Sequence, residues 1–261
     1  RRIIVTTDAA HGTMRKIVNQ EKYRSLIVPD GVGGRFSVLT PVGLFSAAMC
    51  GIDVYGLLDG AAEMDVAVSD PNAATNPAAR IAAIHHLYME QGKRMHVMMP
   101  YSQQLKDMAD WYSQLWAESL GKIRKSDGQN VGPTPIKALG ATDQHSQVQL
   151  YREGPNDKVI TFLEVEEFDV DTVIPRGFVG IEAMDYLGRS KEGTLGGLLN
   201  IEKKATELAL LARQRPSLTV RFPSIAARTI GEFIYLYESV IPIMGKLQGI
   251  NPYDQPAVEL G

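Results

Sequence analysis

The sequence predicts an α/β protein built on parallel sheets, because short apolar strand patterns alternate with helical patterns along the chain. The first alternation is a buried strand over residues 3–6, a helix over 11–22 and a second apolar strand over 25–28. A further alternation of strands and helices follows residue 70. No repeat of fixed period and no low-complexity stretch breaks this pattern.

Capping residues mark the helix that opens the second alternation. Asn76 can cap it, Pro77 suits its first position, and Gly92 is a natural stop. The next helix is expected over 103–119, where apolar residues recur at helical spacing. The other expected elements, in chain order, are helices over 39–50 and 54–68, a strand over 93–99, a strand over 136–139, a helix over 142–151, a strand over 158–165, an irregular acid-rich excursion over 165–191, a helix over 195–213, a strand over 218–220 and a helix over 225–246.

The composition excludes several classes of protein. A net charge of -3 over 261 residues offers no basic footprint for nucleic acid. No apolar run is as long as a membrane span, so we expect no membrane partner. Cys50 is the single cysteine, which rules out an internal disulfide and fits a reducing cytoplasm. The chain opens directly on a strand and stops without a tail, so we expect it to be truncated at both ends.

Residues 31–37 (GVGGRFS) form a glycine-dense loop after a predicted strand. Glycines let a backbone approach a ligand, and their amides can point at an anion. Phe36 stands where a dinucleotide-binding G-x-G-x-x-G motif needs its last glycine, so a nicotinamide site is not indicated. The loop is therefore either part of a ligand site or a plain strand-to-helix turn that carries an exposed Arg35.

Glu118 lies near the end of the helix over 103–119, with Gln114 four residues earlier on the same face. A carboxylate in the last turn meets the negative end of the helix dipole, which favours basicity unless a cation offsets it. Such a carboxylate suits a general base. The alternative is an ordinary exposed glutamate.

A dense polar group, residues 140–147 (GATDQHSQ), opens the helix expected over 142–151. His145 would lie in the first helical turn, where the dipole favours a neutral imidazole. The alternative is a capping cluster in which Thr142 or Asp143 caps the helix and His145 merely packs. The five histidines show no zinc-ligand spacing, so no metal site is expected.

Taken together and in order, four motifs resemble those of the phosphoglucose isomerase family. They are residues 32–37 (VGGRFS), 118–122 (ESLGK), 143–145 (DQH) with Gln149-Leu150 after them, and 253–259 (YDQPAVE). The resemblance runs from Ile3 to the end of the chain. It implies three-layer αβα parallel-sheet SIS domains: the C-terminal part of a first domain over 1–70, a nearly complete second domain over 71–248, and the start of a C-terminal active-site segment over 249–261.

The resemblance implies an aldose–ketose isomerase that interconverts glucose 6-phosphate and fructose 6-phosphate through a cis-enediol(ate), in glycolysis and gluconeogenesis. Glu118 then resembles the base that moves a proton between C2 and C1. Arg35 resembles the cation that stabilises the enediolate. His145 resembles the group that opens the sugar ring, and in the family it comes from the partner subunit, which implies a homodimer.

The same resemblance assigns the substrate contacts. Gln114 and Gln255 resemble substrate-binding amides, and Gly34 would lend its backbone to the pocket. No metal and no organic cofactor is implied, because an enediol route needs only a base, an acid and charge stabilisation.

Two departures from the family pattern stand out. The family's Ser/Thr-rich phosphate loop has no equivalent in the chain, and its active-site lysine would follow Gly261. A smaller difference is Ala257, where glycine is commoner. We therefore expect weak or no isomerase activity from these residues alone. The alternatives are one part of a bifunctional transaldolase/phosphoglucose isomerase and a non-catalytic SIS-type sugar-phosphate-binding module.

Overall fold

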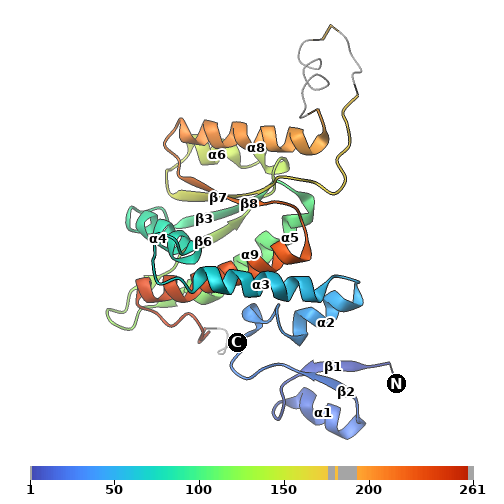
Figure 1. Ribbon diagram of the computed structural model, residues 1–261. Coiled ribbons are helices and arrows are strands. Elements are labelled where there is room, and N and C mark those ends of the chain that lie inside the picture. The colour runs from blue at the N-terminus through green and yellow to red at the C-terminus, as the bar shows by residue number, and fades with distance from the viewer. Residues whose placement is uncertain (1, 176–179, 182–192, 258–261) are drawn as a thin grey trace.

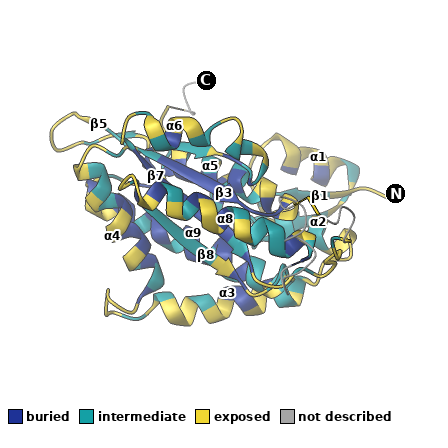
Figure 2. Ribbon diagram, turned by 90° about the horizontal axis from the view of Figure 1, so that it is seen from above, coloured by how far each residue is buried: buried dark blue, intermediate teal, exposed yellow. Residues whose placement is uncertain are grey.

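A parallel sheet of four strands forms the centre of the computed structural model, which describes residues 2–175, 180–181 and 193–257. Its order is β6-β3-β7-β8. The strands span Met95–Pro100 (β3), Thr134–Lys137 (β6), Lys158–Val165 (β7) and Ser217–Phe222 (β8). The two central strands, β3 and β7, are buried along nearly their whole length because helices cover both of their faces. Figure 2 shows these buried residues gathered at the sheet.

Helices cover both faces of this sheet (Figure 1). On one face, Tyr151 and Leu210 from α6 (Val148–Glu153) and α8 (Leu195–Leu211) contact the side chains of β3 and β7. On the other face lie α4 (Pro77–Glu90), α5 (Lys106–Leu120) and α9 (Ala227–Gln248). The predicted α/β class with a parallel sheet between helical layers is thus confirmed.

The first part of the chain is a smaller unit. A parallel pair of strands, β1 (Ile4–Thr7) and β2 (Arg24–Ile27), is joined by α1 (Thr13–Glu21). After α2 (Pro41–Met49), the helix α3 (Val54–Val68) packs closely along α9. Gly60 and Gly231 allow this approach, because a Cβ on either would overlap a backbone carbonyl of the opposite helix.

Local signals placed most helix ends correctly. The Asn76 side chain accepts a hydrogen bond from the backbone amide of Ala79, and Pro77 follows it as the first residue of α4. Gly121 ends α5 as its C-cap. No helix in the described part of the chain is long and apolar enough to cross a membrane.

The helix expected over 142–151 is wrong in its first half. Thr142–Gln144 forms a single 3-10 turn (η3), and α6 begins only at Val148. The carboxylate of Asp143 accepts hydrogen bonds from the Leu139 amide and the Ser146 hydroxyl. These local side-chain bonds compete with α-helical geometry, so His145 follows the 3-10 turn and does not sit in a first α-helical turn.

Smaller differences concern three other segments. Residues Gln103–Leu105 form a 3-10 turn (η2) before α5. Two short antiparallel strands that the sequence did not indicate, β4 (Lys122–Ile123) and β5 (Asn130–Val131), form a hairpin after α5. Within the acid-rich excursion, Val173 pairs with Thr194 in an isolated bridge, while 176–179 and 182–192 lie outside the described residues.

Two histidines are stacked in the core between α4 and β3. The ring centroids of His85 and His96 are 4.2 Å apart, and Trp116 Nε1 donates a hydrogen bond of 3.1 Å to His96 Nδ1. Neither nitrogen of His85, nor Nε2 of His96, has a hydrogen-bond partner within the described chain. Burial lowers the pKa of His85 to about 3 and holds the pKa of His96 well below its usual range.

We predict that this pair makes the fold acid-sensitive. In the unfolded chain a histidine takes up a proton near pH 6.5, whereas folded His85 does so only near pH 3. Stability is therefore full above about pH 6.5 and falls as the pH drops from there, by about 1.4 kcal/mol per pH unit for each such proton. Urea unfolding at pH 7.5, 6.0 and 5.0 should show a shallower decline for His85→Leu than for the wild type. The exposed His11→Leu serves as the control, and equal slopes in all three proteins would contradict the assignment.

Candidate active site

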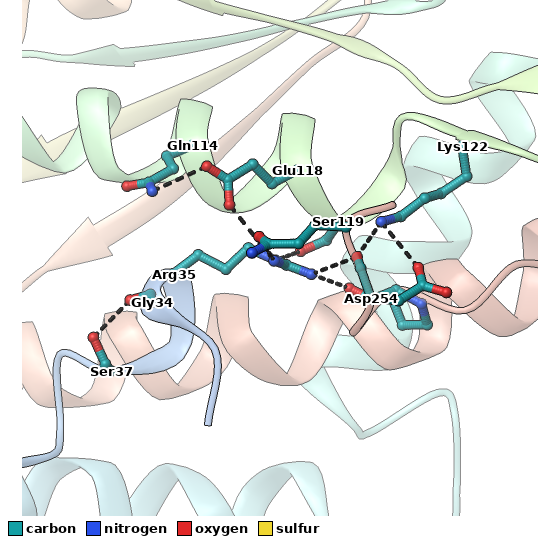
Figure 3. Close-up of polar contacts among 10 residues, drawn as sticks. Gly34, Arg35, Ser37, Gln114, Glu118, Ser119, Lys122 and Asp254 are labelled. Carbon is teal, nitrogen blue, oxygen red and sulfur yellow. Dashed lines mark hydrogen bonds and ion pairs between the residues drawn. The ribbon is translucent and has the colours of Figure 1, made fainter. Parts of the chain in front are cut away.

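The guanidinium of Arg35 lies at the centre of a group of polar side chains (Figure 3). Arg35 belongs to a 3-10 turn, Gly34–Phe36 (η1), which follows the carboxyl end of β2. The residue is only 2% exposed. A buried charge is costly unless it is fully paired, so the partners of Arg35 define the site.

Those partners come from two distant segments of the chain. Arg35 Nε donates to Ser119 Oγ at 2.8 Å, and NH1 donates to Gln255 Oε1 at 3.0 Å. NH2 donates to the carbonyl oxygens of Pro252 (2.7 Å) and Asp254 (3.2 Å). The guanidinium thereby ties the end of α5 to the segment that follows α9.

Glu118 in the last turn of α5 completes the charge balance. Its Oε2 lies 3.5 Å from Arg35 NH1, and its side chain is 29% exposed. Gln114, one turn earlier, donates from Nε2 to Glu118 Oε1 at 3.1 Å. Burial lowers the pKa of Arg35 from its usual value, and the charges of Glu118 and Asp254 oppose that shift.

The segment after α9 is held against α5 by a second cation. Gly249 ends α9 in the left-handed conformation (φ 69°), which turns the chain back toward α5. Lys122 contacts the Asp254 carbonyl oxygen, and its Nζ lies 3.2 Å from the Asp254 carboxylate. This pair fixes the stretch that carries Gln255.

Sequence reasoning missed three contributors to the site: Ser119, Lys122 and Asp254. Their place in the chain could have drawn attention to them, since Ser119 and Lys122 belong to the ESLGK stretch and Asp254 precedes Gln255. A side chain's hydrogen-bond partner 84 positions away cannot be read from local pattern.

A cavity of about 830 Å³ opens beside these residues. Glu118, Lys122 and Gln255 line it together with residues of the β4–β5 hairpin and of 249–257. It is large enough for a small organic ligand. Arg35 lies behind this wall and contacts two of the lining residues, Glu118 and Gln255. A carboxylate at the wall can accept a proton, and a cation beside it can stabilise a negative oxygen that develops as the proton leaves.

His145 lies elsewhere in the same chain. The helix α5 connects the parallel strands β3 and β6, so it returns the chain from the carboxyl edge of the sheet to the amino edge. Glu118 therefore lies toward the amino edge, whereas His145 follows the carboxyl end of β6. His145 is exposed, and within the described chain no hydrogen bond or ion pair links it to Arg35, Glu118 or Gln255.

The predicted site residues are thus divided. Gly34, Arg35, Gln114, Glu118 and Gln255 come together, and His145 does not. The last part of the predicted C-terminal motif, 258–259, lies outside the described residues. No group of three or more His, Cys, Asp or Glu side chains that could hold a metal ion occurs in the described ranges.

The chain is similar to known glucose-6-phosphate isomerases. The chain is 49% identical over 261 residues to a glucose-6-phosphate isomerase of Carboxydothermus hydrogenoformans, covering 99% of this chain and 56% of that protein. It is 46% identical to the glucose-6-phosphate isomerase of Rubrobacter xylanophilus, covering 100% of this chain and 58% of that protein. The chain therefore spans a little over half the length of these relatives.

Solved structures show the same fold. A protein of Thermus thermophilus described as hypothetical superposes with a TM-score of 0.92 at 37% identity, covering 100% of this chain and 61% of its own. A glucose-6-phosphate isomerase of Chlamydia trachomatis gives a TM-score of 0.82 at 22% identity, covering 99% and 50%, which supports the fold alone. The sequence profile of the family described as phosphoglucose isomerase matches residues 3–261, and the chain belongs to this family.

Proposed function

We propose that this chain carries the proton-transfer site of an aldose–ketose isomerase that interconverts glucose 6-phosphate and fructose 6-phosphate. The observation that carries the proposal is the partly exposed Glu118 carboxylate at the wall of a cavity. It lies 3.5 Å from the buried guanidinium of Arg35. The family membership and the names of the relatives, glucose-6-phosphate isomerases, support the substrate.

The arrangement suits an enediolate route. In the aldose-to-ketose direction, Glu118 takes the proton from C2, the C2–H electron pair forms a C1–C2 double bond, and negative charge moves onto the C1 oxygen. The hydroxyl proton of C2 then passes to the C1 oxygen, and Glu118 returns its proton to C1 as the C2 oxygen becomes the carbonyl. The NH1 edge of Arg35, which faces Glu118, would stabilise the oxygen on which charge develops.

Gln114, Gln255 and Gly34 would orient the sugar. Gln114 holds one oxygen of Glu118, so it also limits the directions in which the carboxylate can turn. Gln255 lines the cavity and its amide oxygen accepts a hydrogen bond from Arg35, which supports a role in binding the substrate beside this cation. Gly34 would present backbone atoms beside Arg35. This chemistry requires neither a metal nor an organic cofactor.

We further propose that the active protein is a homodimer in which His145 acts in the site of the partner subunit. His145 and Glu118 lie toward opposite edges of one sheet, so a histidine that opens the sugar ring at Glu118 would come from a second copy. The exposure of His145 on the monomer is consistent with such an interface.

Three finer assignments accompany this proposal: the domain boundaries, the metabolic role and the location in the cell. Residues 1–70 would complete a first SIS domain, 71–248 would form the second, and 249–261 would begin the C-terminal active-site segment. Among the described residues the β1–β2 ribbon has only two strands, and this favours the assignment of residues 1–70, because a two-stranded sheet is marginal alone. We also propose a role in glycolysis and gluconeogenesis and a cytoplasmic location, which fits the single exposed Cys50.

The base assignment predicts the effect of Glu118→Gln in the full natural chain. A glutamine keeps the shape and the contact with Gln114 but cannot take a proton, so kcat should fall by about 10³-fold. Exchange of the C2 proton with deuterated solvent should be lost together with isomerisation. Glu90→Gln, at an exposed glutamate in the last turn of α4, is the matched control. Wild-type exchange rates in Glu118→Gln would remove Glu118 as the base, whereas a wild type that binds the sugar phosphate without exchanging its C2 proton would favour a sugar-phosphate-binding module.

The shared site predicts complementation between inactive variants. Glu118→Gln and His145→Ala homodimers should each be inactive, but mixed dimers contain one intact Glu118–His145 site. Co-expression should recover about a quarter of the wild-type activity, since half of the dimers are mixed and half of their sites are intact. Co-expression of Glu118→Gln with Arg35→Lys should recover none, because both groups belong to one subunit. Equal recovery in the two pairings would contradict the assignment of His145.

A further inference from the structure

The three edges of the Arg35 guanidinium have separate tasks. Arginine offers five N–H donors in a planar fork. The NH2 edge donates to the carbonyl oxygens of Pro252 and Asp254, and Nε donates to Ser119 Oγ. Only the NH1 edge faces Gln255 and Glu118, the side chains at the cavity. Figure 3 shows the contact of Arg35 with Glu118. The direction of NH1 is therefore decided by what holds the other two edges.

The two carbonyl contacts alone do not fix that direction. Both converge on NH2 and both belong to the segment after α9, so the planar group could pivot about this edge. The bond from Nε to Ser119 Oγ anchors the opposite side of the plane, and it comes from a different element, α5. Ser119 itself is fully buried, at 0% exposed.

Ser119 is also the chain neighbour of Glu118. Successive residues of a helix point about 100° apart, so one turn of α5 directs Glu118 toward the cavity and Ser119 toward the interior. The anchor of the cation and the carboxylate are thus carried by the same rigid turn.

We propose that Ser119 is a positioning residue that holds the NH1 edge of Arg35 at the distance from Glu118 that enediolate stabilisation requires. The inference rests on the isomerase function proposed above and adds a residue to it. Ser119 does not line the cavity and would act through Arg35. Loss of its hydroxyl would leave a buried Nε–H without an acceptor and free the guanidinium to turn.

A double-mutant cycle in the full natural chain tests this coupling. Ser119→Ala should lower kcat by about 10- to 100-fold with KM changed less than about threefold, because positioning errors act mainly in the transition state. In an Arg35→Lys background, which has no Nε, the same substitution should cost less than about twofold. Ser119→Thr, which keeps the hydroxyl, should recover most of the loss. Ser113→Ala is the control on the same helix, since the Ser113 hydroxyl has no hydrogen-bond partner within the described chain.

A spectroscopic readout separates this proposal from the function on which it rests. The Nε–H proton of Arg35, identified by its absence in Arg35→Lys, should give a slowly exchanging NMR signal. That signal should persist in Ser119→Thr and Ser113→Ala, and shift or broaden in Ser119→Ala. If the wild type does not isomerise glucose 6-phosphate, the proposed function is wrong. The NMR signal still shows whether Ser119 holds the Nε–H of Arg35.

Two results would overturn the proposal. One is an Arg35 Nε–H signal that is unchanged in Ser119→Ala. The other is a loss of kcat by the same factor in the wild-type and Arg35→Lys backgrounds, which is the behaviour of a residue that only stabilises the fold.

Discussion

The burial of one positive charge organises the site. Arg35 can be withdrawn from water only because the end of α5 and the segment after α9 supply acceptors for its donors and a carboxylate for its charge. These segments are 84 and 217 or more positions away from Arg35 in the chain. Other contacts support the guanidinium here: Lys122 pairs with Asp254, Ile250 packs against the core cluster that contains α5, and the ring centroids of Phe36 and Tyr253 are 5.7 Å apart.

The same requirement explains how the site is built on the fold. The η1 turn follows β2 in the small N-terminal unit, whereas Glu118 and Ser119 lie in the last turn of α5. Figure 1 shows β2 in the small unit and α5 against the main sheet. The close packing of α3 on α9, which depends on Gly60 and Gly231, joins the two units. The site therefore lies where the two units meet. Its geometry depends on the packing of α3 against α9, which joins one unit to the other.

The sequence was most informative where structure is local. Apolar runs predicted β3 and β7, and Asn76 with Pro77 marked the start of α4, because strand burial and helix capping depend on near neighbours. The first half of the helix over 142–151 was wrong because Asp143 forms bonds within its own turn that an apolar pattern does not reveal. The roles of Ser119 and Asp254 could not be predicted, since they arise only when distant segments meet Arg35.

Amide hydrogen–deuterium exchange in Arg35→Lys tests most directly whether this guanidinium organises the site. Lysine keeps the charge but lacks the planar fork that reaches Ser119, Pro252 and Asp254 at once. Exchange at residues 250–257 should accelerate at least about tenfold over the wild type, while exchange in the centre of α9 stays the same. Unchanged exchange at 250–257 would contradict the account, because it would mean that this segment is held in place without Arg35.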